Sequence, residues 1–128
     1  MKTKFSLIAM ALWALFLTAA CSENQAVADV KGLPVKGMVT MIDLGADQCI
    51  PCKMMAPILA ELRQEYQGKA AIVFLDVRKD QSLVGKYGIR VIPTQIFYDQ
   101  AGREYLRHEG FMDKKTIVAI LTKLGVKS

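Results

Sequence analysis

Two cysteines three residues apart are the residues of this sequence best suited to chemistry. Cys49 and Cys52 flank an Ile-Pro pair where an apolar strand expected over residues 38–45 gives way to a helical pattern. One turn of helix begun at Cys49 brings the second sulfur back toward the first, so a disulfide can form and break with little backbone movement. The spacing and its context predict a redox dithiol.

The first cysteine is expected at the start of a helix, where its reactive form is favoured. Unpaired backbone amides and the positive end of the helix dipole stabilise a thiolate there, and the thiolate is the attacking species. Pro51 suits this opening turn, because its missing amide proton costs little at that position. Ile50 and Pro51 are therefore predicted to open an active-site helix.

A zinc site is the chemical alternative for two closely spaced cysteines. Such a site needs about two more ligands, and the chain offers only His108 and Cys21 as further histidine or cysteine ligands. His108 is expected to be a surface strand residue. The sequence therefore favours no metal and no cofactor beyond the Cys49–Cys52 disulfide.

The hydrophobic pattern predicts one α/β domain over residues 38–128. Strands joined by helices are expected to run parallel, and the last two strands are expected to form an antiparallel hairpin. The result would be a mixed central sheet with three parallel strands plus a hairpin, flanked by helices on both faces. The strands are expected over 38–45, 70–77, 94–98 and 104–109, and the helices over 50–67, 81–87 and 114–124, with Gly88 ending the second helix and Asp113 capping the third.

The first 20 residues are typical of an export signal. Lys2 and Lys4 precede an uncharged, mostly apolar run over residues 5–20. The run has 16 residues, fewer than the about 20 that a membrane-spanning helix needs. A cleaved signal is thus favoured over a retained membrane helix, and residues 21–37 are expected to form a polar tether.

The sequence allows two alternative cleavage sites for this signal. Residues 17–21, Leu-Thr-Ala-Ala-Cys, resemble the lipobox of bacterial lipoproteins, in which the cysteine receives a lipid and becomes the new N-terminus. A cut after Ala28, behind an Ala-x-Ala pattern, would instead free a soluble periplasmic or secreted protein. Because an unlipidated Cys21 would be an odd thiol in an oxidising compartment, the sequence favours a lipid anchor at Cys21 on the periplasmic side of a bacterial envelope.

The net charge of the chain gives little information about its function. The net charge of +5 falls to +3 when Lys2 and Lys4 are removed with the signal, and the remaining charges are scattered. A scattered charge of this size does not favour nucleic-acid binding. The sequence shows no internal repeat, and we expect a monomer.

Five features of the sequence occur in a fixed order. They are a strand ending in an acid (39–43), a dithiol helix with a later proline (49–57), a segment with an Ile-Pro pair (86–94), and the glycines Gly102 and Gly110. In this combination the chain resembles the thioredoxin family over residues 38–126. The resemblance implies the thioredoxin fold and a thiol:disulfide oxidoreductase.

The resemblance implies a role for each cysteine and for one proline. Cys49 would attack a substrate disulfide, and Cys52 would then attack Cys49 and release the reduced substrate. Pro93 would be cis, packed against the dithiol, and would turn the Ile92 backbone outward as an edge for an extended substrate. The substrate-docking residues implied are Ile50, Ile92, Thr94, Gly110 and Phe111, although Phe111 could pack in the core instead.

Asp43 matches the acid that thioredoxins bury behind the second cysteine. Burial would raise its pKa and let it accept a proton from Cys52 through water. The alternative is a strand-end aspartate that caps a turn. The lysine that thioredoxins place nearby corresponds to Phe74, and the aromatic residues around their dithiol correspond to Gly45 and Gln48, so the docking surface is altered.

The direction of electron flow is predicted from the residues between the cysteines. Strong oxidants of this superfamily carry a cation there, which stabilises the reduced thiolate, whereas Ile50 and Pro51 carry no charge. The prediction is an exported protein-disulfide reductase recharged by a membrane electron donor, with apocytochrome c thiols among its possible substrates. The alternatives are a thiol oxidase or isomerase of the same fold, or a non-catalytic binding module.

Overall fold

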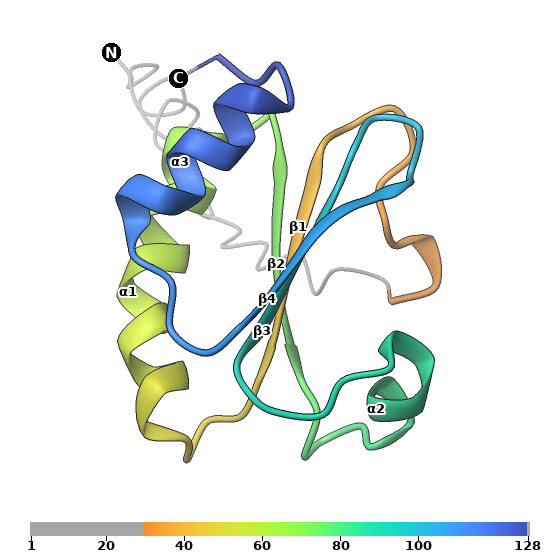
Figure 1. Ribbon diagram of the computed structural model, residues 1–128, viewed down its shortest axis with the longest axis vertical. Coiled ribbons are helices and arrows are strands. Elements are labelled where there is room, and N and C mark those ends of the chain that lie inside the picture. Colours follow the sequence, from red (N-terminus) through yellow and green to blue (C-terminus); the bar gives the residue numbers. More distant parts are fainter. Residues whose placement is uncertain (1–29, 128) are drawn as a thin grey trace, which may run out of the picture.

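The computed structural model describes residues 30–127, which form a four-stranded sheet with helices on both faces (Figure 1). The expected signal over residues 1–20, the expected lipidation site Cys21 and most of the expected tether lie outside the described residues. Within residues 30–127, no helix combines the length and apolar character that a membrane span needs.

The expected elements are present in type and order, and their ends lie within two residues of the predicted ones. The sheet has the strand order β2-β1-β3-β4, so β1 is an inner strand. The elements are a short 3-10 turn (Val30–Gly32), β1 (Thr40–Gly45), α1 (Ile50–Glu65), β2 (Ala71–Asp76), α2 (Ser82–Tyr87), β3 (Thr94–Tyr98), β4 (Glu104–Glu109) and α3 (Lys114–Lys123).

The expectation of three parallel strands is wrong. Strand β1 runs parallel to β2, but it pairs antiparallel with β3, and β3 pairs antiparallel with β4. The six residues of α2 reach about 9 Å, so this helix alone does not carry the chain back along the about 20 Å that the six residues of β2 span. The connection from β2 to β3 stays near the end of the sheet where β2 finishes, and β3 begins there (Figure 1).

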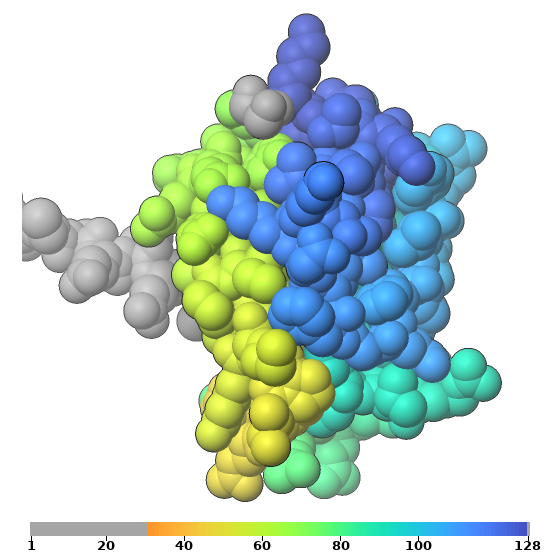
Figure 2. Space-filling view, turned by 60° about the vertical axis from the view of Figure 1, so that its left-hand side comes forward, coloured from red at the N-terminus to blue at the C-terminus, as the bar shows by residue number. Residues whose placement is uncertain are grey.

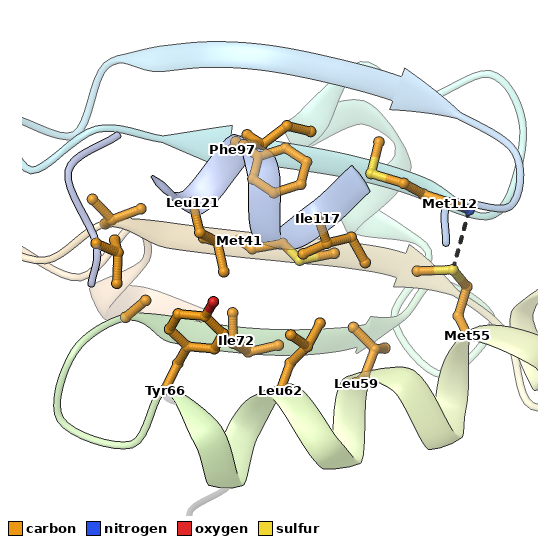
Figure 3. Close-up of a cluster of buried hydrophobic side chains, with 14 residues drawn as sticks. Met41, Met55, Leu59, Leu62, Tyr66, Ile72, Phe97, Met112, Ile117 and Leu121 are labelled. Carbon is orange, nitrogen blue, oxygen red and sulfur yellow. Dashed lines mark hydrogen bonds between the residues drawn. The ribbon is translucent and has the colours of Figure 1, made fainter. Parts of the chain in front are cut away.

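Strand β1 is buried along its whole length because it contributes to two cores. Alternate side chains of a strand point to opposite faces. Met41 packs in the core between the sheet and helices α1 and α3, which Figure 3 shows. Ile42 and Leu44 pack in the second core, with Leu83 and Tyr87 of α2. By the same alternation Asp43 lies on the α1 face of the sheet.

Two predicted helix ends are confirmed. Gly88 ends α2 in the left-handed conformation, at φ 59°, which glycine adopts without steric cost. Asp113 caps α3, where its carboxylate accepts hydrogen bonds from the backbone N–H of Thr116 at 3.0 Å and from the Thr116 hydroxyl at 2.7 Å. These local signals end the helices where the chain must turn.

The last residues of the expected tether lie against the sheet. Leu33 packs on the second core, and the backbone N–H of Val35 donates to the Thr40 hydroxyl oxygen at 3.0 Å. The backbone N–H of Gly37 donates to the carbonyl of Gln100 at 3.2 Å. The chain is therefore packed on the domain for several residues before β1, while its division into signal, tether and domain stays a prediction.

Candidate active site

The two cysteines lie at the N-terminal end of α1 and are joined by a disulfide. Cys49 is the N-cap residue, with an extended backbone, and its Sγ accepts a hydrogen bond from the backbone N–H of Cys52 at 3.4 Å. The Cα atoms of the pair are 5.1 Å apart. The first sulfur thus lies at the helix end whose amides and dipole favour a thiolate once the bond is reduced.

The two sulfurs differ in exposure. Cys49 is partly exposed, whereas Cys52 is buried with 4% of its surface accessible. Ile50 between them projects into solvent with 76% of its surface exposed. A macromolecular substrate can therefore reach the first sulfur, while the second is reached from inside the protein.

The segment before β3 lies against the dithiol. The Ile92–Pro93 peptide bond is cis, as expected, and Pro93 is buried. The Ile92 carbonyl oxygen lies 4.0 Å from Cys49 Sγ. The Pro93 carbonyl accepts a hydrogen bond from the backbone N–H of Gly110 at 2.8 Å. In Figure 2 the start of α1 (yellow), this segment (teal) and the β4–α3 turn (blue) meet at one end of the molecule.

The expected docking residues differ in what they offer to a substrate. Phe111 is 40% exposed, because its neighbour Met112 occupies the core position and donates its backbone N–H to Met55 Sδ (Figure 3). Thr94 is fully buried and its hydroxyl donates to the Val91 carbonyl at 2.7 Å, so its side chain shapes the loop and has no free surface. Val91 itself is 46% exposed, and sequence reasoning missed it because its exposure depends on how the chain turns before Pro93.

Asp43 is fully buried on the central strand. Burial raises the pKa of its carboxyl from 3.8 to about 6, as expected, against a hydrogen bond from Gln95 and the positive charge of Arg63. Gln95 lies directly opposite on β3 and donates its Nε2–H to Asp43 Oδ1 at 2.8 Å. The role of a turn cap is therefore not supported, since the carboxylate contacts a neighbouring strand.

Phe74 and Gly45 occupy the space behind Cys52. A Cβ atom on Gly45 would lie 3.0 Å from the Phe74 ring and 3.1 Å from Cys52 Sγ, so a side chain here would require one of these neighbours to shift by a few tenths of an ångström. A pocket of about 240 Å³ opens beside these residues, and its lining includes Cys52, Phe74 and Arg63. The pocket is large enough for water next to the sulfur that is hidden from the docking side.

His108 lies on β4, with its Nε2 at 3.2 Å from the Phe111 carbonyl oxygen. Over residues 30–127, no three histidine, cysteine or carboxylate side chains are grouped so that they could hold a metal ion. The chemistry of the described site is that of the dithiol, the buried acid and the cis-proline segment.

Comparison with known proteins identifies the family. The family model described as Thioredoxin matches residues 19–123. Thioredoxin of Staphylococcus aureus (strain Mu50 / ATCC 700699) is 39% identical over 89 residues, which are 70% of this chain and 85% of that protein. The chain belongs to the thioredoxin family, and its Cys49–Cys52 disulfide makes it a thiol:disulfide oxidoreductase.

Solved structures show the same fold. A chloroplastic thioredoxin z is similar with a TM-score of 0.65 and 25% identity, over 73% of this chain and 84% of that one. The exposed lipoprotein thioredoxin of Streptococcus pneumoniae strain TIGR4 is similar with a TM-score of 0.62 and 22% identity, over 69% of this chain and 86% of that one. The expected thioredoxin fold is confirmed.

The buried carboxyl of Asp43 is expected to lower the stability of the oxidised protein above about pH 6. The folded state binds its proton more tightly than the unfolded state, because burial raises the folded pKa from 3.8 to about 6. Stability therefore falls as the pH rises between these values, by about 3 kcal/mol in total. We expect Asp43→Asn to unfold with about 2–3 kcal/mol more free energy at about pH 8, and the gain to vanish below about pH 4.

Urea unfolding across this pH range measures the effect. The matched control is Asp47→Asn, an exposed aspartate whose ion pair with Lys79 lies at the surface and contributes little to stability. A gain for Asp43→Asn that is the same at every pH would contradict the expected burial effect.

Proposed function

We propose that this protein is an exported protein-disulfide reductase that works through Cys49 and Cys52. The observation that carries the proposal is the disulfide at the start of α1, with its accessible sulfur 4.0 Å from the carbonyl of Ile92 before a cis-proline. This arrangement supports exchange with an extended protein substrate and requires no cofactor beyond the disulfide.

The first step is attack by the Cys49 thiolate of the reduced protein on a substrate sulfur. The substrate S–S bond breaks, a mixed disulfide forms, and the other substrate sulfur leaves as a thiolate that takes a proton from water. The accessibility of Cys49 and its position at the helix end support this order of attack.

The second step releases the substrate. The Cys52 thiol gives its proton to the Asp43 carboxylate through water, and the resulting thiolate attacks Cys49 Sγ. The mixed disulfide breaks, the second substrate thiolate leaves, and the protein ends oxidised, having passed two electrons to the substrate. Cys52 and Asp43 are both buried, which supports this division of roles.

Substrate docking is assigned to the exposed apolar side chains around the dithiol. Ile50, Val91 and Phe111 are all at least 40% exposed, and exposed apolar side chains gathered at one place are typical of an interaction site. We infer that they contact the apolar side chains of the substrate, while the backbone at Ile92 and Gly110 pairs with its main chain. Such a rim excludes water from the exchanging sulfurs.

The reducing direction follows from the absence of charge between the cysteines. Ile50 and Pro51 add nothing that stabilises a thiolate beyond the helix end, so the disulfide is a weak oxidant. In an oxidising compartment, a membrane electron donor is then needed to restore the dithiol. Protein disulfides are the proposed substrates, with those of apocytochromes c among them.

We expect the two cysteines to fail in different ways when each is replaced by serine. Cys49→Ser removes the nucleophile, so reduction of insulin disulfides falls to the uncatalysed rate. Cys52→Ser leaves the nucleophile without a resolving thiol, so covalent complexes accumulate that dithiothreitol releases. Turbidity measures the reduction of insulin, and gel electrophoresis measures the covalent complexes. Cys21→Ser serves as the control and is expected to have normal activity. Normal turnover by Cys52→Ser would overturn the mechanism.

We expect the Cys49–Cys52 pair to have a reduction potential near that of thioredoxin, about −270 mV. The measurement equilibrates protein lacking residues 1–28 against a thioredoxin standard. A value near about −120 mV would reverse the direction and make the protein a thiol oxidase.

We expect Cys21 to carry a lipid in bacterial cells, because residues 17–21 have the order of a lipobox. Metabolic labelling with an alkyne fatty acid would mark the wild type and Cys49→Ser, while Cys21→Ser would lose the label and leave the membrane fraction. A mature N-terminus immediately after Ala28, found by mass spectrometry, would contradict the anchor and indicate a soluble exported protein.

A further inference from the structure

Asp43 and Gln95 form a buried polar pair in the centre of the sheet. Both side chains are fully buried, and they lie opposite each other on β1 and β3. Gln95 Nε2 donates to Asp43 Oδ1 at 2.8 Å. Asp43 Oδ2 and Gln95 Oε1 have no hydrogen-bond partner among the described residues. Only part of the hydrogen-bonding capacity of the pair is therefore satisfied, and the two oxygens without a partner are both acceptors.

The amide of glutamine has one property that no apolar or cationic side chain shares. Its NH₂ group donates to a carboxylate, whereas its carbonyl accepts from the O–H of a carboxylic acid. A turn of about 180° about the terminal bond exchanges the two atoms and places Oε1 where Nε2 lay. Gln95 can thus pair with Asp43 whether or not that acid carries a proton.

We propose that Gln95 is a positioning residue that follows the proton of Asp43, donating to the carboxylate and accepting from the acid. This inference rests on the proposed function, because it gives Asp43 the proton of Cys52. In that step the Cys52 S–H bond breaks and an O–H bond forms on Asp43, and no electron moves. The proton later passes to water, which returns Asp43 to the carboxylate.

Apart from Gln95, none of the groups described below forms a hydrogen bond with the carboxyl group of Asp43. On β2 the residue paired with Asp43 is Phe74, which carries no charge. On β4 the residue paired with Gln95 is His108, whose Nε2 lies 3.2 Å from the Phe111 carbonyl oxygen. Helix α1 contributes Cys52, which titrates when it is reduced, and the cation Arg63. Arg63 donates its Nε–H to the Ile72 carbonyl at 3.2 Å and acts on Asp43 through its charge. Gln95 is the described residue that is hydrogen-bonded to the carboxylate.

The first test replaces Gln95 in the oxidised protein and follows the Asp43 carboxyl carbon by NMR against pH. Gln95→Leu and the longer Gln95→Met remove the hydrogen bond to each form of Asp43. Because the bond to the charged carboxylate is the stronger of the two, we expect the midpoint of Asp43 to rise by about one pH unit. Gln64→Leu, which changes an exposed glutamine on α1, is expected to leave the midpoint unchanged. An unchanged midpoint in a folded Gln95 variant would overturn the proposal.

The second test uses the unaltered sequence, so it does not depend on whether a variant folds. The side-chain amide resonances of Gln95 are expected to shift with the same midpoint as the Asp43 carbon. Amide resonances that stay constant through the Asp43 titration would overturn the proposal. Both tests use oxidised protein without substrate, so a protein inactive as a reductase can still pass them, and an active reductase can fail them.

The third test separates positioning from a merely structural role. We expect Gln95→Leu to move the pH profile of mixed-disulfide release upward by the shift that NMR records for Asp43. In an Asp43→Asn background, the same substitution is expected to leave the pH profile unchanged. A uniform loss of rate at every pH, with no displaced profile, would show that Gln95 only supports the fold.

Discussion

The burial of β1 on both faces is the constraint on which the rest of the structure depends. Because Met41 packs under α1 and α3 while Ile42 and Leu44 pack toward α2, the strand is held between two apolar cores. Its end then determines where α1 begins, and so where the dithiol lies. The same burial takes the carboxyl of Asp43 out of water and raises its pKa. One strand therefore positions the sulfurs and sets the protonation of the acid behind them.

Local signals made most of the fold predictable from the sequence. The hydrophobic periods placed the elements, and the residues at helix ends, such as Gly88 and Asp113, act on their nearest neighbours. The direction of β3 was not predictable in the same way, because it depends on the path that the chain takes between β2 and β3. The general rule for strands joined by helices does not settle that path, and it gave the wrong direction for β3.

Gln95 shows why part of the site could not be predicted. Asp43 was found because it interrupts an apolar strand, whereas Gln95 lies 52 residues away and becomes its partner only through the antiparallel register of β1 and β3. A sequence read with β3 parallel to β1 would not pair the two residues in this register. The error in topology and the missed residue thus have one cause. The exposure of Val91 was missed for a related reason, since it depends on how the cis-proline segment turns.

The residues Phe74 and Gly45 behind Cys52 depend on each other. Phe74 stands where a lysine would face Asp43, and its ring fills space that a side chain on residue 45 would occupy. With Gly45 at that position, both the ring and Cys52 Sγ have room, and the residue that Asp43 faces on β2 carries no charge. The carboxylate is then left with a neutral hydrogen-bond donor and a more distant charge on Arg63. An acid in these surroundings accepts a proton more readily than one paired with a cation, which supports the proposed transfer of a proton from Cys52.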